Sequence, residues 1–484
     1  MTNKWHTLHP ATTYVLLLLF IIIASWICDI YGVRVTDPQT GGTIFIQNLL
    51  NAEGIRWLIK HVQSNFLSFD TFGMGVVTIL GIGVAEHSGF INALTRQFTK
   101  HHYNQRTIIL IVIIAGVCSS VMGDIGYILL LPIAVYLFKG AKLPQQAGII
   151  VALVSVSCGF GANILITSIE PIIVRYTQEV AELNNISQSH IGIMSNYWFS
   201  VVSMIPQIYI IYRITTKHLI PQLLKKEPVS DEPNKSLSKK EQHALRNALV
   251  FGAIYLVIVC IATFSPWGIL RGVMGDLIHS PFIYGSLFII SFGIGMMGVV
   301  YGFSTNIYES DKDVIGGFTH LLKLLGNFLV ISFFASQLFA CISYSNLDEY
   351  LLVNAGQWFS SCRWTHPIIA LFIFILLTAS LNLFVTSGTH KWSVLAYFAI
   401  PILSKLSISP DIVQSSFHIG DSVNTFITPF LPYAAWVLAW LIYFDKRSSF
   451  DTLIRYTWRY SLAMFSVWTG LFILWFALKI PFGF

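Results

Sequence analysis

The stretch SPDIVQSSFHIGDSVNTFITPFLP, residues 409–432, decides the fold of this chain. It interrupts an apolar segment with three prolines, one glycine, two aspartates and several hydroxyl and amide side chains. A helix broken in this way frees backbone N–H and C=O groups, and lipid cannot satisfy them because it holds no water. We therefore expect residues 409–432 to form a broken membrane helix that lines a polar cavity walled by protein.

The same pattern occurs in the first half of the chain. Residues 159–171 align with residues 420–432 without a gap, and five of the thirteen positions are identical: the glycine, the asparagine, an Ile-Thr pair and the last proline. Both copies interrupt apolar segments. Internal repeats with broken helices around a site near the middle of the bilayer are typical of secondary transporters. The sequence therefore predicts two related halves that share one site.

Composition places the whole chain in the membrane. Of the 484 residues, 55% are hydrophobic and 11% are charged, and the mean hydropathy is +0.67. These charges are too few for the surface of a soluble protein of this size. Repeated apolar runs of about 20 residues favour one integral bundle over several soluble domains. The net charge of +6 is therefore interpreted as a signal of topology, and no nucleic-acid partner is expected.

The apolar segments predict the membrane-embedded elements. They are residues 13–33, 69–90, 106–120, 125–140, 145–176, 195–216, 247–266, 281–304, 316–344, 366–385, 392–405, 409–442 and 456–481. Two close pairs, within 106–140 and 366–405, are joined by a few polar residues, and we interpret them as re-entrant hairpins. Each hairpin directly precedes one broken helix. The predicted fold is an all-α integral membrane protein with nine transmembrane helices and two re-entrant hairpins, arranged as an inverted repeat.

Charge distribution sets the expected orientation. The segment 217–246 holds seven Lys and Arg residues, whereas the loop 177–197 holds none. Because Lys and Arg accumulate on the cytoplasmic side, we place 217–246 as a cytoplasmic linker between an N-terminal half, 1–216, and a C-terminal half, 247–484. Each half contains one hairpin and one broken helix. The protein is expected in the cell inner (plasma) membrane, with its N-terminus in the cytoplasm and its C-terminus outside.

Residues 51–67, between the first two spans, show an amphipathic pattern. A helix there places Ile55 and Ile59 on one face and Arg56 and Lys60 on the other. This pattern favours a helix that lies in the membrane interface. The alternative is a plain loop.

Ionisable side chains at membrane depth are costly, and they are functional candidates by default. Five lie in a hairpin or a broken helix: Asp124, Glu170, Lys391, His418 and Asp421. The Asp421 carboxylate, with freed carbonyls and neighbouring hydroxyl and amide oxygens, offers the oxygen shell that a Na⁺ ion prefers. The alternative is that Asp421 only caps the second half-helix.

Lys391 and three further residues have two interpretations each. Asn163 and Asn424 occupy equivalent positions in the two copies, and their side-chain oxygens either complete a candidate Na⁺ site with Asp421 or satisfy backbone groups at the breaks. Lys391 near the second hairpin tip either attracts an anionic substrate or snorkels to the outer interface. Trp392 either stacks on a substrate ring or anchors the chain at the interface.

Several segments, spread over most of the chain, resemble one known family. They are Val35–Gly41, Glu53–Trp57, Gly81–Gly89, Gly159–Phe160 with Ala162–Asn163, Asn382–Phe384, Lys391–Trp392, Ile408–Pro410 and Ile419–Val423. By these segments the chain is similar to the p-aminobenzoyl-glutamate transporter (AbgT) family. The resemblance implies a homodimer whose subunits have nine membrane helices and two hairpins. It also implies an ion-driven carrier that takes up p-aminobenzoyl-glutamate or exports sulfonamide antimetabolites.

The resemblance also implies site residues. The positions that match family positions tied to transport are Asn382, Trp392, Pro410, Asp421 and Pro429. Two ionisable positions depart from the family pattern, because Glu170 stands where the family has aspartate and His418 stands where it has arginine. Both departures fall at the expected site, so they bear on the substrate more than on the fold.

We therefore expect an ion-coupled secondary transporter of a small aromatic or anionic solute, with Na⁺ or H⁺ as the coupling ion and no cofactor. Its expected partners are the solute, the lipid bilayer and a second copy of the chain. The alternative is an intramembrane enzyme whose polar residues at membrane depth are catalytic. Because the sequence contains no H-E-x-x-H, G-x-S-x-G or Walker-A motif, we expect neither an enzyme nor direct use of ATP.

Single cysteines test the expected orientation, in a variant that lacks the six native ones. A cysteine at Ser230 should react with a membrane-impermeant maleimide only from the cytoplasmic side, and one at Ser187 only from outside, because the two segments are placed on opposite faces. Labelling of both positions from one face would contradict the inverted repeat.

Overall fold

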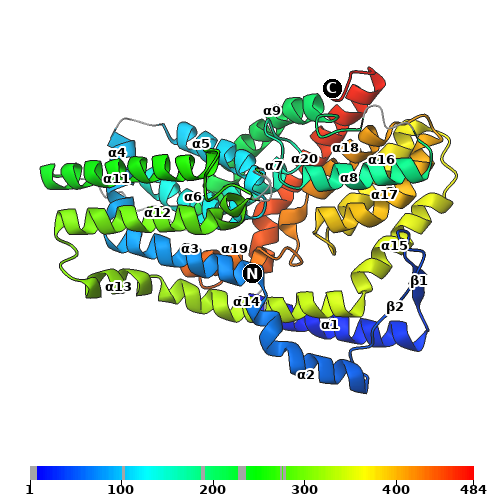
Figure 1. Ribbon diagram of the computed structural model, residues 1–484, viewed down its shortest axis with the longest axis horizontal. Coiled ribbons are helices and arrows are strands. Elements are labelled where there is room, and N and C mark those ends of the chain that lie inside the picture. The colour runs from blue at the N-terminus through cyan, green and yellow to red at the C-terminus, as the bar shows by residue number, and fades with distance from the viewer. Residues whose placement is uncertain (1–7, 101–103, 187–190, 227–235, 273–274, 276–279) are drawn as a thin grey trace.

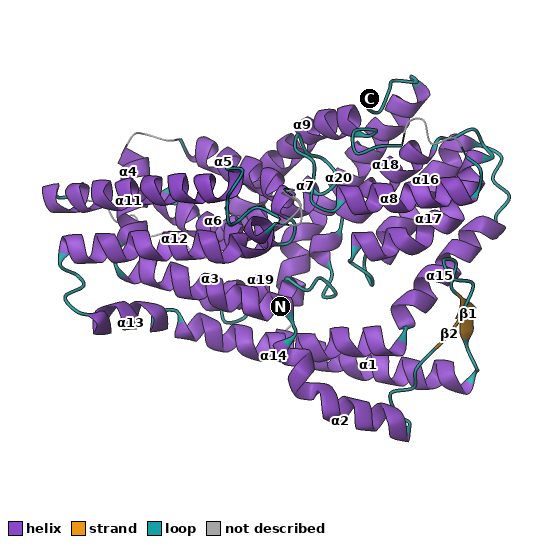
Figure 2. Cartoon of the chain, viewed as in Figure 1, coloured by secondary structure: helices purple, strands orange, loops and turns teal. Residues whose placement is uncertain are grey.

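The computed structural model describes residues 8–100, 104–186, 191–226, 236–272, 275 and 280–484. Within these ranges the chain is almost entirely helical, and one small two-stranded hairpin accompanies the helices (Figures 1 and 2). The strands β1 (Arg34–Thr36) and β2 (Thr43–Phe45) are antiparallel, with Val35 opposite Ile44.

The helices follow one another along the chain with short connections. They are α1 (Pro10–Ile30), α2 (Ala52–Leu67), α3 (Asp70–His87), α4 (Phe90–Lys100), α5 (Gln105–Ser119), α6 (Ile125–Gly140), α7 (Gln145–Gly159), α8 (Glu170–Leu183), α9 (Tyr197–Ile214), α10 (Ile220–Leu224), α11 (Lys239–Phe264), α12 (Pro281–Thr305), α13 (Asp311–Thr319), α14 (Leu322–Ser345), α15 (Leu347–Ser361), α16 (Pro367–Leu381), α17 (Gly388–Ser404), α18 (Pro410–Ser422), α19 (Ala434–Phe444) and α20 (Phe450–Ala477). Short turns are η1 (Ser120–Met122), the π-helical η2 (Thr215–Leu219) and η3 (Thr425–Ile427).

Many of these helices are long and apolar. In the described ranges, seven helical segments are long and apolar enough to cross a membrane: Pro10–Ile30, Ala52–His87, Gln105–Met122, Lys239–Phe264, Pro281–Thr305, Leu322–Ser345 and Phe450–Ala477. Shorter apolar helices are Ile125–Gly140, Gln145–Gly159, Pro367–Leu381 and Ala434–Phe444. The chain therefore forms a multi-pass helical membrane protein, as predicted. The count of nine crossings and the re-entry of the hairpins stay predictions.

Several helix boundaries differ from those predicted, and the largest differences have local reasons. The predicted span 316–344 is divided, because α13 ends at Thr319 and α14 begins at Leu322. Both flanks of the predicted linker 217–246 are helical: η2 and α10 continue α9, and a capping box at Ser238 starts α11 well before residue 247. The middle of that linker, 227–235, lies outside the described residues.

The sequence analysis does not predict α15. Its acidic first turn, Asp348 and Glu349, interrupts the apolar pattern that identifies a span. In the structure these two carboxylates lie 3.5 and 3.4 Å from Nε2 of His390, at the beginning of α17. α15 therefore supports the tip of the second predicted hairpin.

α2 coincides with the segment predicted to be amphipathic. The side chains of Ile55 and Ile59 are exposed on its surface. An exposed apolar face suits a helix that borders lipid, and its position in the membrane interface stays a prediction.

The two copies of the repeated pattern are interrupted helices with matching surroundings. The first copy runs from α7 to α8, and the second runs from α18 through η3 to α19. α7 packs on α5, α6 and α9, and α18 packs in the same way on α16, α17 and α20. Helices of the two halves also contact each other: α7 packs on α19, and α18 packs on α8. Residues of both breaks are thereby brought to the centre of the molecule.

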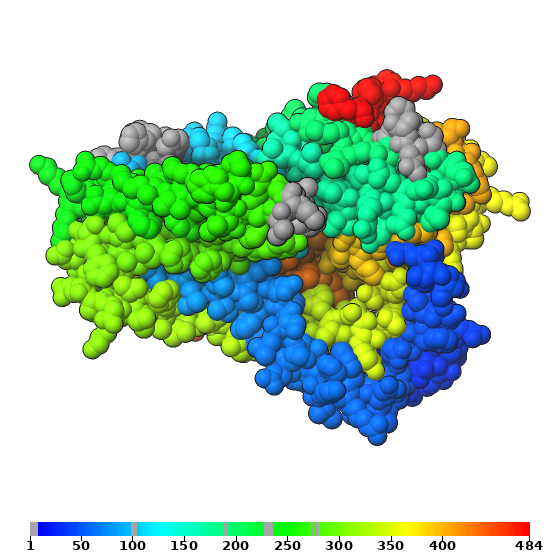
Figure 3. Space-filling view, viewed as in Figure 1, coloured from blue at the N-terminus to red at the C-terminus, as the bar shows by residue number. Residues whose placement is uncertain are grey.

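α7 and α19 form the middle of the packed core. Both are buried along nearly their whole length and are apolar on all sides, which is typical of a helix surrounded by protein. On the face drawn in Figure 3, the surface is hollowed between the blue N-terminal helices, the green segment that contains α8 and the yellow segment that contains α15. Orange residues of the C-terminal half are visible at the floor of this hollow.

Glycines allow each interrupted helix to approach the hairpin beside it. A Cβ atom at Gly159 would lie 2.3 Å from the carbonyl oxygen of Val117 in α5. A Cβ atom at Gly420 would lie 1.8 Å from Oγ1 of Thr378 and 2.7 Å from the carbonyl oxygen of Ile375 in α16. Gly159 and Gly420 therefore have the same structural role in the two copies of the repeated pattern, which is to allow close packing on a hairpin helix.

Gly420→Ala should destabilise the folded protein by about 1–3 kcal/mol, because the added methyl group has to displace α16. Thermal unfolding of the purified protein in detergent measures this as a lower apparent melting temperature. Gly470→Ala in α20 is the matched control, since nothing lies within 4 Å of a Cβ atom at Gly470. Equal melting temperatures for the two variants would contradict the close packing of α18 on α16.

Candidate functional site

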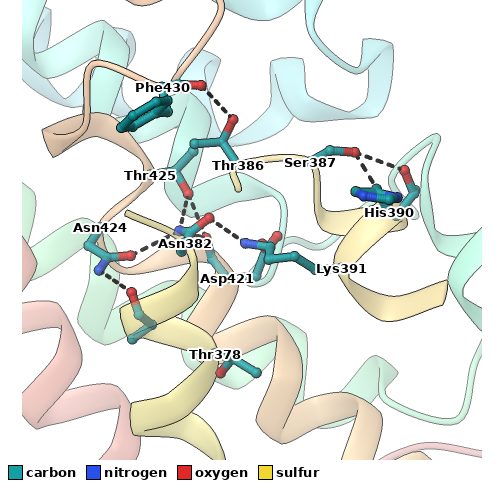
Figure 4. A network of polar contacts seen from close by, with 12 residues as sticks. Thr378, Asn382, Thr386, Ser387, His390, Lys391, Asp421, Asn424, Thr425 and Phe430 are labelled. Atoms are coloured by element: carbon teal, nitrogen blue, oxygen red, sulfur yellow. Dashed lines mark hydrogen bonds and ion pairs between the residues drawn. The ribbon is translucent and has the colours of Figure 1, made fainter. Parts of the chain in front are cut away.

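A buried charge pair joins the second hairpin to the second break (Figure 4). The Lys391 side chain is 0% exposed, and its Nζ forms an ion pair with the Asp421 carboxylate and donates to Oδ1 of Asn382. Nδ2 of Asn382 lies 2.5 Å from the carbonyl oxygen of Asp421, 2.9 Å from Oδ1 of Asn424 and 2.8 Å from Oγ1 of Thr425. The polar network therefore fixes the tip of the hairpin to the broken helix.

This pair gives Asp421 a different partner from the one predicted. The carboxylate was expected to hold a Na⁺ ion, and in the structure it holds the ammonium group of Lys391. Its Oδ2 atom lies against the backbone of Gly388, where a Cβ atom would be only 2.6 Å away. Lys391 points inward at Asp421 rather than toward an interface, so its charge is already matched inside the protein.

Asn163 and Asn424 perform the same structural task in the two copies. Nδ2 of Asn163 donates to the carbonyl oxygen of Val117 at 2.8 Å, and Nδ2 of Asn424 donates to that of Ala379 at 2.7 Å. Oδ1 of Asn163 accepts the N–H of Leu165 at 3.0 Å. Each asparagine therefore ties an interrupted helix to the end of the neighbouring hairpin helix and satisfies backbone groups there.

A second polar chain connects the two halves. Nε2 of His418 lies 3.2 Å from Oε2 of Glu170, and Nε2 of Gln414 donates to Oε1 of the same carboxylate at 2.7 Å. Oε1 of Gln414 accepts the Thr177 hydroxyl at 2.6 Å, and that hydroxyl accepts the indole N–H of Trp392 at 2.9 Å. The chain runs from α18 through α8 to α17. The two departures from the family pattern, Glu170 and His418, are therefore direct partners.

Two cavities lie at the breaks. The larger has a volume of about 310 Å³, and its lining comprises Asp124, Tyr127, Ser157, Phe160, Ile169, residues 386–389, Asp421, Ser422, Thr425 and residues 431–433. The smaller has a volume of about 40 Å³ and is lined by Asn163, Glu170 and His418, among others. Phe160 lines both cavities, so the two cavities share this residue.

The structure distributes the predicted residues over these surroundings. Asp421 lines the larger cavity, and Asn163, Glu170 and His418 line the smaller one. The predicted residues that line neither of these two cavities are Asn382, Lys391, Trp392, Pro410, Asn424 and Pro429. Asp421, Asn163 and Asn424, the three candidate Na⁺ ligands, are therefore not gathered around one cavity.

The two prolines shape the second interrupted helix. Pro410 is the first residue of α18, where a missing N–H leaves no hydrogen bond unmade. The carbonyl oxygen of Pro429 accepts the hydroxyl of Tyr14 from α1 at 3.2 Å. Pro429 therefore links the second break to the first helix of the chain.

Sequence reasoning missed the aromatic part of the larger cavity. Tyr127, Phe160 and Tyr433 line it, and no local pattern distinguishes them from the many other aromatic residues of the chain. Asp124, a candidate from the sequence as a carboxylate at membrane depth, lines the same cavity. Its position at a hairpin tip directly before α6 was the available signal.

Comparison with known proteins places this geometry in context. The model of the family described as "AbgT putative transporter family" matches residues 5–484. The chain is 26% identical over 476 residues to the p-aminobenzoyl-glutamate transport protein of Escherichia coli (strain K12), and the match covers 98% of this chain and 93% of that protein.

Two solved structures are also similar over nearly the whole chain. The Alcanivorax borkumensis YdaH transporter, described as having an unusual topology, is 30% identical with a TM-score of 0.53, and the match covers 98% of this chain and all of that one. Neisseria gonorrhoeae MtrF, described as illuminating a class of antimetabolite efflux pumps, is 27% identical with a TM-score of 0.51. That match covers 98% of this chain and 96% of the MtrF chain.

A double-mutant cycle tests the pairing of Glu170 with His418. Glu170→Asp shortens the acid and His418→Arg lengthens the base, so each single variant should disturb the contact, whereas the double variant should restore a pair of similar total length. We expect a coupling free energy of about 0.5–3 kcal/mol, measured from initial transport rates at one pH and matched protein amounts. Strictly additive losses would show that the two side chains act independently.

Proposed function

Because the chain belongs to the AbgT transporter family, we propose that it is an ion-coupled secondary transporter that moves a small aromatic or anionic solute through the larger cavity by alternating access. Its family and its relatives are named as transporters rather than as enzymes. The observation that carries the proposal is the position of this cavity between the two hairpin tips and the two helix breaks.

The cavity walls come from elements of both halves. Asp124 and Tyr127 belong to the first hairpin, residues 386–389 to the second, and Phe160 and Asp421 to the two interrupted helices. A movement of either hairpin relative to the interrupted helices would therefore change the shape of the cavity. This is the arrangement that alternating access at a fixed central site requires.

The Lys391–Asp421 pair is the proposed point of ion coupling. A charge left buried without its partner is strongly unfavourable, so the pair holds the second hairpin against the second break for as long as both groups are charged. A proton that neutralises Asp421 would release this hold, and a Na⁺ ion would have to compete with the ammonium group of Lys391. The Lys391 ammonium group opposes both a proton and a Na⁺ ion at Asp421, so we propose that the coupling ion, H⁺ or Na⁺, binds as this ion pair opens.

The names of the relatives and the size of the cavity support the proposed solute. One relative is named for p-aminobenzoyl-glutamate and another is described among antimetabolite efflux pumps. The volume of about 310 Å³ is at the low end of the range of roughly 300–1,000 Å³ that is usual for small-molecule sites. Uptake of a p-aminobenzoyl-glutamate-like solute and efflux of a sulfonamide-type antimetabolite are the two directions that the proposal includes.

The same proposal covers assembly and location. We place the transporter as a homodimer in the inner (plasma) membrane, with the N-terminus in the cytoplasm and the C-terminus outside. The excess of Lys and Arg in 217–246 over 177–197 supports this orientation. The division into two inverted halves is supported by the repeated contacts of α7 and α18 with their neighbours.

Asp421→Asn should abolish counterflow of labelled p-aminobenzoyl-glutamate in proteoliposomes. It should also destabilise the protein by about 3–5 kcal/mol, because it leaves the Lys391 ammonium buried without a carboxylate. The double variant Asp421→Asn/Lys391→Gln removes both charges, so we expect it to regain thermal stability and to remain inactive.

Asp451→Asn is the matched surface control. The Asp451 side chain is 60% exposed and its partner among the described residues is Arg455, one helical turn away, so both transport and stability should stay at the wild-type level. A double variant Asp421→Asn/Lys391→Gln that transports at the wild-type rate would show that coupling takes place elsewhere in the protein.

A further inference from the structure

The wall of the larger cavity on the side of the first hairpin is aromatic. The rings of Tyr127 and Tyr433 are stacked, with centroids 5.0 Å apart and an interplanar angle of 10°. Phe160 continues the stack on Tyr127, at 6.1 Å and 20°. The three rings come from the first hairpin and from both breaks, and all three line the cavity. Such a wall binds a planar ring through offset stacking or edge-to-face contact.

One hydrogen bond and burial hold this wall in place. The Tyr127 hydroxyl is 2.9 Å from Oγ of Ser157 in α7. Tyr127 and Tyr433 are buried, with 2% and 7% of their surfaces exposed. The rings are therefore preorganised, and a bound solute would not have to order them.

Asp124 adds an acidic side chain to the same wall. Its side chain is exposed to the cavity, and in the described part of the chain no lysine or arginine forms a salt bridge with it. Lys391 is fully buried and engaged by Asp421, and the Asp70 carboxylate adds repulsion rather than compensation. Tyr433 lines the same cavity, and the side-chain oxygens of Asp124 have acceptor capacity toward it.

The opposite wall has a different character. The tip of the second hairpin contributes Thr386, Ser387 and Thr389. Ser422, at the second break, has a buried hydroxyl that makes no hydrogen bond within the described residues and that lines the same cavity. The cavity therefore has one end that is aromatic and anionic and another that carries neutral hydroxyl groups.

We propose that the wall of Asp124, Tyr127, Phe160 and Tyr433 is a subsite for an aromatic primary amine. The ring of the solute packs on the aromatic wall, and its amino group donates a hydrogen bond to Asp124. A carboxylate at this end is repelled, so any anionic group of the solute lies toward the hydroxyl-bearing wall. The subsite rests on the proposed function, because it takes the larger cavity as the solute site.

Equilibrium binding to the purified protein in detergent tests the subsite without any ion gradient. The probes are p-aminobenzoyl-glutamate and benzoyl-glutamate, which differ only in the ring amino group. A hydrogen bond to a charged acceptor predicts that the wild-type protein binds the amine about tenfold to hundredfold more tightly. Isothermal titration calorimetry gives both dissociation constants.

Variants separate the role of the carboxylate from that of the rings. Asp124→Leu removes the acceptor, so the preference for the amine should disappear. Asp124→Asn keeps the shape and loses the charge, so the preference should fall to a few-fold, and this variant serves if the leucine variant does not fold. Phe160→Leu should weaken both probes by the same factor, about twofold to tenfold, because it removes only ring contact.

The outcomes distinguish the subsite from the transport function. Equal binding of both probes by the wild-type protein, or an undiminished preference in Asp124→Leu or Asp124→Asn, would overturn the subsite and leave the proposed function standing. A wild-type protein that binds neither probe would overturn both.

Discussion

A peptide group within hydrocarbon has no water to bind, and this constraint explains the centre of the structure. Two helices stop inside the molecule, at Gly159 and at Ser422, and each leaves backbone groups that need partners. In both places an asparagine of the break donates to a carbonyl of the neighbouring hairpin helix. The hairpins are therefore the structures that make interrupted helices tolerable, and the glycines allow them to come close enough.

The breaks in turn determine where charge can be placed. The fully buried Lys391 neutralises Asp421 at the wall of the larger cavity, whereas Asp124 faces the same cavity and forms no salt bridge with a lysine or arginine of the described residues. The site therefore contains one ion pair whose charges cancel, Lys391–Asp421, and one acidic side chain, Asp124, without a lysine or arginine partner among the described residues. The pair is suited to holding or releasing a hairpin, and the carboxylate is suited to contact with a solute. Glu170 and His418 form a second contact between ionisable groups, at the smaller cavity.

Much of this architecture was predictable from local chemistry. Proline, glycine and asparagine inside an apolar run indicate a break wherever they occur together, so both interrupted helices were found from the sequence. Pairing across the fold was not predictable. Asp421 looked like a cation ligand because its neighbours in sequence carry oxygens, and only the folded chain brings Lys391 to it. α15 was not predicted, because its polar first turn interrupts the apolar pattern of the helix. The ring stack of Tyr127 was not predicted either, because its three rings lie in separate segments of the sequence.

The packing between helices of the two halves also has a consequence for membrane insertion of the chain. A chain is synthesised from its N-terminus, so α7 and α8 enter the membrane before α18 and α19 exist. Until then α7 lacks α19 and α8 lacks α18, the helices against which they pack in the finished molecule. The first half must therefore wait, with its polar break exposed, near the insertion machinery. Quality control of the first half is thereby tied to the arrival of the last helices of the chain.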